Sequence, residues 1–414
     1  MTTISKKKAA APGQAATSVA ATGVAATGPT AILMPRRPER ARHPWVFEGE
    51  IASLPDEVQD GQPVRVLDHR RRFFAMAYCN RRSKIILRLL SRIDEPIDAA
   101  WWKRAIAASV ARRGDLAPDD AVRLVNAEGD RLPGVIVDRY AGWLSIQLST
   151  LGADAMRSAI VEALTNACSP AGIFERSDVP ERSLEGLEPK TGTLTGGEPP
   201  ETVEIREGDA RLLVDIAHGQ KTGLFLDQRV NRHAAAAYAK GRRVVNCFAY
   251  SGGFSVHAAL AGAMAVTSVD ISAPACALAL RNMALNGFAD ADVVEANCFD
   301  WLRHADDSGE RFGMAILDPP AFARGKSTID SALRGYKEIN LRAIRTLEPG
   351  GILVTCSCSR PIGLDDFVGV VKAAGDDAGR DIQLLEERTQ PPDHPVLLDA
   401  PETSYLKCLI VRAL

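Results

Sequence analysis

Four groups of residues in the second half of the chain have types and spacing suited to chemistry: Gly252-Gly253, Asp270, Asp318-Pro319-Pro320 and Cys356-Ser357-Cys358. Each group follows a short apolar run of the kind that forms a buried parallel strand. In an open parallel sheet, the carboxyl ends of the strands lie along one edge, and ligands bind there. We therefore expect the four groups to line a single site.

The glycine pair and Asp270 indicate a nucleoside-binding unit. Residues 244–248 predict a buried strand, an alanine-rich helix follows, and residues 265–269 predict a second strand that ends at Asp270. Glycine has no Cβ, so a ligand can lie against the backbone at Gly252. The spacing of 18 positions from Gly252 to Asp270 suits a carboxylate that holds the two hydroxyls of a ribose.

The unit lacks the spaced G-x-G-x-x-G pattern of dinucleotide-binding enzymes. A cofactor with a ribose but no pyrophosphate fits better, and S-adenosylmethionine (SAM) is such a cofactor. The alternative is that these glycines only make the first turn of an ordinary strand–helix–strand unit.

Asp318 and Cys358 predict methyl transfer to carbon. Residues 313–317 and 352–357 are expected to form neighbouring strands, about 5 Å apart, which would bring both side chains into one pocket. The C5 carbon of a pyrimidine is a poor nucleophile, but a thiolate that adds to C6 turns the ring into an enamine. An acid near N3 supports that addition, and a base later removes the C5 proton. The alternative is that Cys358 is a small buried apolar residue and that the prolines only end a strand.

The composition is that of a globular protein with more than one domain. The chain has 414 residues, of which 46% are apolar and 25% charged. It contains no apolar run long enough to span a membrane, so no membrane association is expected. The eight cysteines show no C-x-x-C spacing, so no metal site is expected. Their scatter through apolar runs is typical of a reducing compartment, and the cytoplasm is the expected location.

Positive charge gathers near the front of the chain. Residues 32–92 hold thirteen basic and seven acidic residues, although the net charge of the whole chain is −2. This asymmetry favours a surface that faces a nucleic acid over an arginine-rich solvated face. The candidate RNA contacts are Arg36, Arg37, Arg70, Arg71, Arg72, Arg81, Arg82 and Lys84.

Patterning divides the chain into four parts. Residues 1–30 lack aromatic residues and predict a disordered tail. Residues 31–97 predict a small β domain, and residues 98–216 a central α+β domain in which 183–200 is a mobile loop or linker. Strict alternation of strands and helices begins at Gln228, and residues 217–414 are predicted to form an α/β, Rossmann-like domain.

Several blocks of sequence together resemble one family. They are Gly-Gln-Lys-Thr-Gly at 219–223, Asn-Cys-Phe-Ala-Tyr-Ser-Gly-Gly at 246–253, Asp-Pro-Pro-Ala-Phe at 318–322, Arg-Gly-Tyr-Lys-Glu at 334–338, Ser-Cys-Ser at 357–359 and Asp-His-Pro at 393–395. These blocks resemble the RlmI-type SAM-dependent 23S rRNA (cytosine-C5) methyltransferases. The resemblance covers nearly everything after the tail.

The resemblance implies a PUA domain over 31–97, a central domain over 98–216 and a class I methyltransferase domain over 217–414. It implies Cys358 as the nucleophile, with Asp318 beside it in the catalytic pocket. It also implies a set of SAM contacts: Gln228, Asn246, Phe248, Tyr250, Gly252, Gly253, Asp270, Asn297 and Asp318.

The chain departs from the family pattern at three places. Asn297 stands where an aspartate usually faces the adenine amino group, and its amide oxygen can still accept that hydrogen bond. Cys356 stands where the family often has an apolar residue, which leaves open which thiol attacks, although register favours Cys358. No additional cysteine follows Asp318, so product release by a second thiol there is not expected.

The expected function is therefore the formation of 5-methylcytidine in large-subunit ribosomal RNA. One rival is an RNA guanine-N2 methyltransferase, which shares an Asp/Asn-Pro-Pro loop but needs no cysteine. A second rival is a non-catalytic RNA-binding factor for ribosome assembly that keeps a vestigial cofactor fold. The sequence leaves open the target nucleotide, the choice between naked rRNA and an assembled particle, the base for the C5 proton, and a homodimer.

Overall fold

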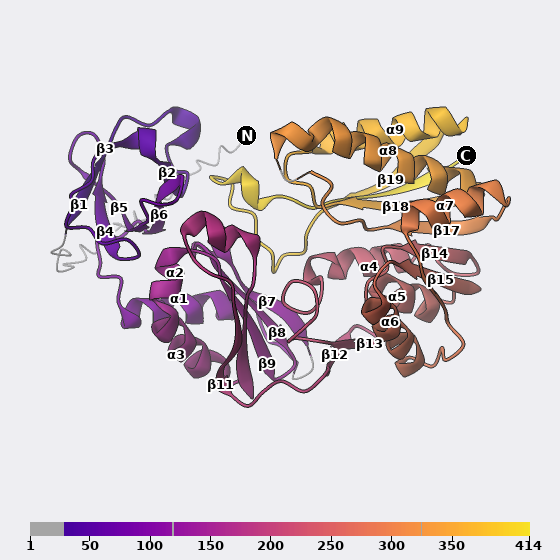
Figure 1. Cartoon of the computed structure of the whole chain (residues 1–414), viewed down its shortest axis with the longest axis horizontal. Coiled ribbons are helices and arrows are strands. Elements are labelled where there is room, and N and C mark those ends of the chain that lie inside the picture. The colour runs from indigo at the N-terminus through magenta and orange to yellow at the C-terminus, as the bar shows by residue number, and fades with distance from the viewer. Residues whose placement is uncertain (1–28, 118–119, 324) are drawn as a thin grey trace, which may run out of the picture.

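The computed structural model describes residues 29–117, 120–323 and 325–414 (Figure 1). Almost all of the predicted N-terminal tail lies outside these residues, and the first strand begins at Thr30. In Figure 1 a small β-rich region lies on the left, a mixed region lies below the middle, and the largest sheet lies on the right between layers of helices. None of the described helices combines the length and apolar character that a membrane crossing requires.

The N-terminal region is a six-stranded sheet in the order β2-β6-β5-β4-β1-β3. Along β4, Val64 and Val66 are buried, whereas their neighbours are only partly buried. This period of two places the valines on the inner face, with Leu87 and Val46. The elements are β1 (Thr30–Leu33), η1 (Pro38–Arg40), β2 (Trp45–Phe47), η2 (Glu48–Glu50), β3 (Ile51–Ser53), β4 (Pro63–Leu67), β5 (Phe73–Cys79) and β6 (Ile85–Ser91).

The central region is a five-stranded sheet in the order β11-β10-β9-β8-β7, and its core includes Trp102 and Ile106 from α1 together with Leu164 from α3. Asp98 caps α1 by accepting from Trp101 N at 2.9 Å. The elements are α1 (Ala99–Ala111), β7 (Ala121–Asn126), η3 (Ala127–Asp130), β8 (Val135–Tyr140), β9 (Trp143–Leu148), α2 (Leu151–Ala155), α3 (Arg157–Cys168), β10 (Gly172–Ser177), η4 (Pro180–Glu185) and β11 (Lys190–Gly196).

The prediction of a mobile loop or linker over 183–200 is wrong for much of that stretch. Residues 190–196 form β11, which pairs antiparallel with β10 at the edge of the sheet. Gly192 takes a φ of 137° and still pairs with Glu175 of β10, and Gly196, with a φ of 78°, is the last residue of the strand. The composition indicates a loop, but the backbone hydrogen bonds offered by β10 decide the conformation.

A two-stranded hairpin joins the central region to the last one. It consists of β12 (Val203–Glu207) and β13 (Ala210–Val214). Its inward residues Ile205 and Leu212 are at most 1% exposed and share a core with Tyr140 of β8 and with Val256 and Met283 of the following region. The hairpin therefore packs against both the central region and the C-terminal region.

The C-terminal region is a seven-stranded sheet in the order β16-β15-β14-β17-β18-β20-β19. The pairs from β16 to β18 are parallel, and β20 is antiparallel to both of its neighbours. The elements are η5 (Leu226–Gln228), α4 (Arg229–Ala236), β14 (Arg243–Cys247), α5 (Gly253–Leu260), β15 (Ala265–Asp270), α6 (Ala273–Leu285), β16 (Asp292–Glu295), α7 (Cys298–Asp307), β17 (Phe312–Leu317), η6 (Lys326–Thr328), α8 (Ile329–Thr346), β18 (Leu347–Ser357), α9 (Leu364–Ala378), β19 (Ile382–Arg388), η7 (Pro401–Thr403) and β20 (Lys407–Ala413).

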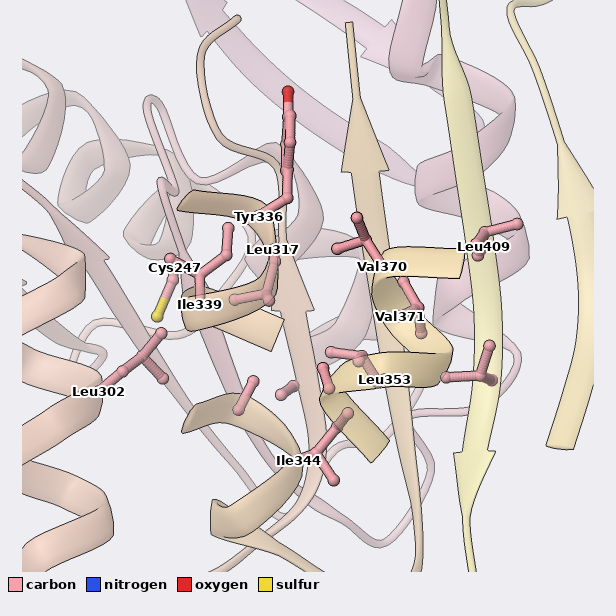
Figure 2. Packing of buried hydrophobic residues seen from close by; sticks show 14 of the residues in the cluster. Cys247, Leu302, Leu317, Tyr336, Ile339, Ile344, Leu353, Val370, Val371 and Leu409 are labelled. Atoms are coloured by element: carbon pink, nitrogen blue, oxygen red, sulfur yellow. The ribbon is translucent and has the colours of Figure 1, made fainter. Parts of the chain in front are cut away.

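The strand order reverses between β14 and β17, because β14 lies between β15 and β17. A reversal of this kind opens a crevice at the carboxyl ends of the strands. Figure 2 shows how α8 and α9 cover one face of the sheet, with Ile344 and Val371 packed against Leu317 and Leu353. Burial of each such side chain stabilises the fold by about 1.5–3 kcal/mol, which holds the crevice on a rigid base.

A C-terminal loop over residues 389–406 connects the three regions. Glu402 lies 3.1 Å from His43 Nε2 of the N-terminal region. Asp393 Oδ2 accepts from Arg123 N of the central region at 3.1 Å. The loop returns to the large sheet at Tyr405, whose hydroxyl donates to Asp227 Oδ2 at 2.7 Å.

Candidate active site

The loop between β14 and α5 turns sharply above the switch in strand order. Phe248, Tyr250 and Gly252 take left-handed backbone conformations, with φ values of 61°, 47° and 78°. The Tyr250 hydroxyl donates to Gly223 O at 2.9 Å, which ties this loop to the Gly-Gln-Lys-Thr-Gly segment. A Cβ at Gly252 would lie 3.1 Å from the Cβ of Ala279, so a side chain there would be both strained and crowded.

Asp270 ends β15 beside this loop, and its carboxylate is held in place. Oδ2 accepts from Tyr250 N at 2.8 Å, and Oδ1 accepts from Ser272 N at 2.9 Å. Each oxygen keeps a further lone pair, so the half-buried carboxylate can accept from two ribose hydroxyls. Asn297, after β16, is exposed and caps α7 by accepting from Phe299 N at 2.9 Å. Its amide group remains accessible at the same edge.

Gln228 and Asn246 lie below the loop. Gln228 Nε2 donates to Asp318 Oδ1 at 2.8 Å, and its Oε1 accepts from Asn231 Nδ2 at 2.7 Å. Asn246 is 1% exposed and donates to Ser255 Oγ at 2.9 Å. Its Oδ1 is buried and has no hydrogen-bond partner among the described residues. Gln228 therefore orients Asp318, and Asn246 leaves one acceptor unpaired at the end of β14.

Asp318 and Cys358 follow two adjacent parallel strands. The predicted pairing of their strands is confirmed, since β17 lies beside β18. Cys358 is partly exposed. Cys356 is 0% exposed and lies opposite Cys408 of β20. A thiol must be accessible to attack a substrate, so the difference in exposure favours Cys358 over Cys356.

Charges of both signs surround the Cys358 thiol. Burial and the nearby Asp227 raise the pKa of Asp318 to about 6. Burial raises the pKa of Cys358, and the carboxylates of Asp318 and Asp227 raise it further. The ammonium groups of Lys221 and Lys407 act in the opposite direction and lower it. Displaced pKa values of this kind are typical of sites that move protons.

Lys407 was not singled out from the sequence. It lies in β20 opposite Ser357, is 8% exposed, and donates through Nζ to Ser359 O at 2.8 Å and Tyr405 O at 2.9 Å. Burial lowers its pKa to about 8. The sequence offers one signal for it, a lysine beside the apolar residues of a strand. A buried ammonium requires hydrogen-bond partners, so such a lysine indicates a polar site nearby.

The predicted RNA contacts separate into two groups. Arg70, Arg71 and Arg72 lie exposed on the turn between β4 and β5, and Arg37, Arg82 and Lys84 are also exposed. The Arg36 side chain is 5% exposed and donates to Glu50, His43 O and Trp45 O. Arg81 donates to Asp60 and to the carbonyls of Val58 and Pro55. Arg36 and Arg81 therefore use their guanidinium groups within the fold.

Comparison with known proteins gives two family matches. The description of S-adenosylmethionine-dependent methyltransferases matches residues 153–412, and that of PUA-like domains matches residues 36–92. The ribosomal RNA large subunit methyltransferase I of Klebsiella pneumoniae (strain 342) is 40% identical over 379 residues, which is 90% of this chain and 95% of that protein. The protein of the same name from Cronobacter sakazakii is 41% identical over 372 residues, covering 88% and 94% of the two chains.

Two solved structures share the fold. A crystal structure of a methyltransferase complexed with SAH has a TM-score of 0.80 and 24% sequence identity, and covers 93% of this chain and all, 100%, of that one. A SAM-dependent methyltransferase from Streptococcus mutans has a TM-score of 0.78 at 24% identity, with coverage of 92% and 99%.

The fold and these matches define a SAM-dependent methyltransferase with a Rossmann-like domain and an N-terminal PUA-like domain. The predicted fold class and the predicted cofactor, SAM, are thereby confirmed. Within that class, the chain belongs to the family of ribosomal RNA large subunit methyltransferase I.

The residues at the sheet edge fit SAM. The Asp270 carboxylate, held by two backbone amides, suits a ribose, and the left-handed turns at 248, 250 and 252 bring backbone rather than side chains to the switch point. Asn246 Oδ1 has no hydrogen-bond partner among the described residues, and the amino and hydroxyl groups of SAM are donors of the kind that it could accept from. SAM supplies an electrophilic methyl group when bound.

Proposed function

We propose that the chain transfers a methyl group to C5 of a cytidine in large-subunit ribosomal RNA through a covalent adduct with Cys358. The observation that carries this proposal is the juxtaposition of Asp318 and Cys358. They follow adjacent parallel strands at the edge that also carries Asp270. The names of the relatives support rRNA as the substrate.

Cys358 is proposed to activate the base. Its thiolate adds to C6, which forms an S–C6 bond and shifts the electrons of the C5=C6 bond toward C5. C5 would then take the methyl group of SAM, which leaves S-adenosylhomocysteine. The C5 proton would leave to a base, and the thiolate would be expelled as the double bond re-forms and N3 returns its proton to the Asp318 carboxylate. Lys221 and Lys407 favour the thiolate, because both lower the pKa of Cys358.

Asp318 is proposed to act as the acid at N3. Its pKa of about 6 keeps a fraction of the carboxyl protonated near neutral pH. The hydrogen bond from Gln228 Nε2 fixes its orientation. A proton delivered to N3 neutralises the charge that thiolate addition places on the ring.

The cofactor is proposed to lie along the edge from Asp270 to Asp318. Asp270 and Asn297 would hold the adenosine part, and the loop over 246–253 would hold the part nearest the reacting carbon. Gln228 would act together with Asp318 at the inner end. We retain the division into a PUA domain (31–97), a central domain (98–216) and a methyltransferase domain (217–414) as part of this proposal.

The RNA is proposed to reach the catalytic pocket from the N-terminal region. The exposed arginines on the β4–β5 turn, with Arg37, Arg82 and Lys84, would contact backbone phosphates. Arg36 and Arg81 are omitted from this set because their guanidinium groups donate both to a carboxylate and to backbone carbonyls. Arg72 is paired with Asp68 as well, but its side chain is 69% exposed, so it is kept in the set.

The direct test is to incubate 23S rRNA with isotope-labelled SAM and the protein, then to identify the methylated nucleoside by mass spectrometry. We expect labelled 5-methylcytidine. RNA in which the target carries 5-fluorocytidine should form a stable covalent complex with the protein, because fluorine cannot leave C5 as a proton would. Label on a guanine N2, or no covalent complex, would overturn the proposed chemistry. Absence of SAM binding in calorimetry would favour the rival of a non-catalytic assembly factor.

A further inference from the structure

A small hollow lies where the N-terminal region, the central region and the C-terminal loop meet. Arg42 and Arg92 come from the N-terminal region, Arg131 from the turn after η3, and Asp399 from the C-terminal loop. The other lining residues are Pro44, Leu89, Leu90, Ser91 and Leu397. Three guanidinium groups therefore share a hollow that holds one carboxylate.

Neutral partners hold Arg92 in place. Its Nη2 donates to Arg42 O at 2.8 Å, its Nη1 donates to Phe74 O at 3.3 Å, and its guanidinium lies 4.3 Å from the centre of the Phe74 ring. Among the residues that the structure describes, no carboxylate lies within ion-pair distance of Arg92 or of the exposed Arg131. Among the described residues, Arg92 and Arg131 thus have no ion-pair partner, and Asp399 acts on Arg92 only across the hollow.

The single carboxylate in the hollow compensates little of this charge. Asp399 Oδ2 lies 3.4 Å from Arg42 Nε, and the two side chains are 38% and 65% exposed. An exposed ion pair of this kind is weak, because water screens the attraction between the two charges. Burial, followed by the repulsion of Arg42, Arg36 and Arg131, lowers the pKa of Arg92 to about 10, which agrees with a crowded positive cluster.

We propose that this hollow, which we call the junction site, binds a phosphate group of the RNA backbone through Arg42, Arg92 and Arg131. An arginine fork suits a phosphate, whose oxygens accept two parallel N–H hydrogen bonds. Binding would relieve the repulsion among the three guanidinium groups. The proposal rests on the proposed function, because it takes RNA as the substrate.

The position of the junction site gives it a role in placing the substrate. The C-terminal loop that supplies Leu397 and Asp399 returns to the catalytic edge at Tyr405, which donates to Asp227. A phosphate held at the junction therefore sets the RNA at a fixed distance from that edge. The adjoining Leu398 is 92% exposed and offers apolar surface to a sugar or base, which a free inorganic phosphate would not use.

The test uses charge changes of opposite sign in the full-length protein. Arg92→Gln and Arg131→Gln should each weaken binding of a 23S rRNA fragment several-fold, and should each reduce the slope of log K against log salt concentration by about 0.7–0.9. Asp399→Asn should strengthen binding several-fold, because it removes the only acidic group in the hollow. Arg211→Gln is a matched control, since Arg211 is an exposed residue already paired with Glu204 on the distant hairpin.

Two further measurements keep the outcomes distinct. SAM binding by calorimetry should be unchanged in all four variants, because Asp270 and the loop over 246–253 are untouched. Inorganic phosphate should not displace the RNA beyond its effect as a salt. The inference is overturned if Arg92→Gln and Arg131→Gln together leave RNA affinity and salt slope unchanged, or if the junction binds inorganic phosphate while RNA affinity does not depend on it. Neither result would bear on whether the wild-type protein forms 5-methylcytidine. If the wild-type protein does not form it, the proposed function is overturned instead.

Discussion

Two clusters of charge contrast with each other, one between the hairpin and the C-terminal region and one at the carboxyl edge of the large sheet. The first, which we call the paired cluster, consists of Glu207, Arg232 and His257 at the base of the hairpin. Arg232 donates to both oxygens of Glu207 at 2.7 and 2.6 Å, and His257 Nε2 lies 2.9 Å from Oε1. Glu207 and Arg232 are each 3% exposed, and the pairing holds the pKa of Glu207 well below its usual range.

The second cluster, at the catalytic edge, consists of Asp227, Asp318, Lys221, Lys407 and Cys358. Here Asp227 is paired with Lys221 at 2.8 Å and its pKa is lowered, but burial and the charge of Asp227 raise the pKa of Asp318 to about 6. The pKa of Cys358 is raised as well, while that of Lys407 falls to about 8. Such an arrangement costs free energy in the folded state.

The difference shows which cluster serves the fold. Where every buried charge has a matched partner, the charges serve the fold. Removal of one partner then leaves the other as an unpaired buried charge, which destabilises the folded state. Where a buried charge lacks a matched partner, it destabilises the folded state. Its pKa then moves toward neutral pH, where the group can exchange protons. Glu207, His233 and His257 also place possible metal ligands within 4.8 Å of one another, but Arg232 already occupies both Glu207 oxygens and would repel a cation.

The largest expected effect is on chemistry alone. Cys358→Ala should lower methyl transfer to rRNA by about a thousandfold or more, since the nucleophile is lost. Its melting temperature should stay within a few degrees of the wild type, because Cys358 is partly exposed. Cys168→Ala in α3 is the matched control and should keep full activity. Methyl transfer at the wild-type rate by Cys358→Ala would remove the proposed mechanism.

The next effect is on stability alone. Arg232→Met should destabilise the fold by about 3–5 kcal/mol, because it leaves the Glu207 carboxylate buried beside His257 only. Chemical denaturation at pH 7 would measure the loss. Because the pKa of Glu207 is depressed, the stability from this pair should be present above about pH 4.5 and be lost as pH falls further. The exposed pair Arg211–Glu204 provides the control, and Arg211→Gln should cost less than about 1 kcal/mol.

Asp318→Asn should separate activity from stability. Activity should fall about a hundredfold with the loss of the acid. Because the pKa of Asp318 is raised from 3.8 to about 6, stability should fall as pH rises through that interval and stay lower above it. The variant, which cannot ionise, should therefore be more stable than the wild type at pH 7.5, by about 1–2 kcal/mol. If the variant is instead less stable there, the Asp318 carboxylate is compensated in a way that contradicts the contrast between the clusters.

The pH profile gives a second view of Asp318. In the wild type, kcat/KM requires the protonated acid and the thiolate together, so it should be flat between about pH 6 and the pKa of the thiol, whose usual value is 9.0. Without the acid, only the thiolate fraction changes. The residual activity of Asp318→Asn should therefore rise about tenfold per pH unit over that interval. Parallel profiles for the two proteins would contradict the assigned role.

The smallest expected effect concerns Lys407 as a positioning residue. Lys407→Met removes an ammonium that lowers the pKa of Cys358, so alkylation of this thiol by iodoacetamide should shift to higher pH. Activity at pH 7 should fall about tenfold for each unit of that shift, and the flat part of the pH profile should extend to higher pH at this lower level. Lys407→Arg should restore part of the activity. A loss of activity with no change in thiol reactivity would assign Lys407 to structure, through Ser359 O and Tyr405 O.

The sequence predicts much of the fold because hydrophobic pattern encodes strands and helices locally. Apolar runs and the residues that end them predict the strand that ends at Asp270 and the strand that ends just before Asp318. The strand over 190–196 was not predicted, since an edge strand depends on its partner more than on its own residues. The division of the arginines was not visible either, because Arg36 and Arg70 look alike until the fold buries one of them.

By itself, the sequence determined the class of protein, a SAM-dependent methyltransferase, and it predicts the chemistry that we propose. A glycine turn, two carboxylates and a thiol at strand ends are properties of short segments, and short segments carry their own pattern. Only the tertiary structure decided the charge around the thiol, the difference in exposure between Cys356 and Cys358, and the meeting of Arg42, Arg92 and Arg131. The physical reason is that electrostatic energy depends on distance through space, and folding brings together groups that lie far apart along the chain.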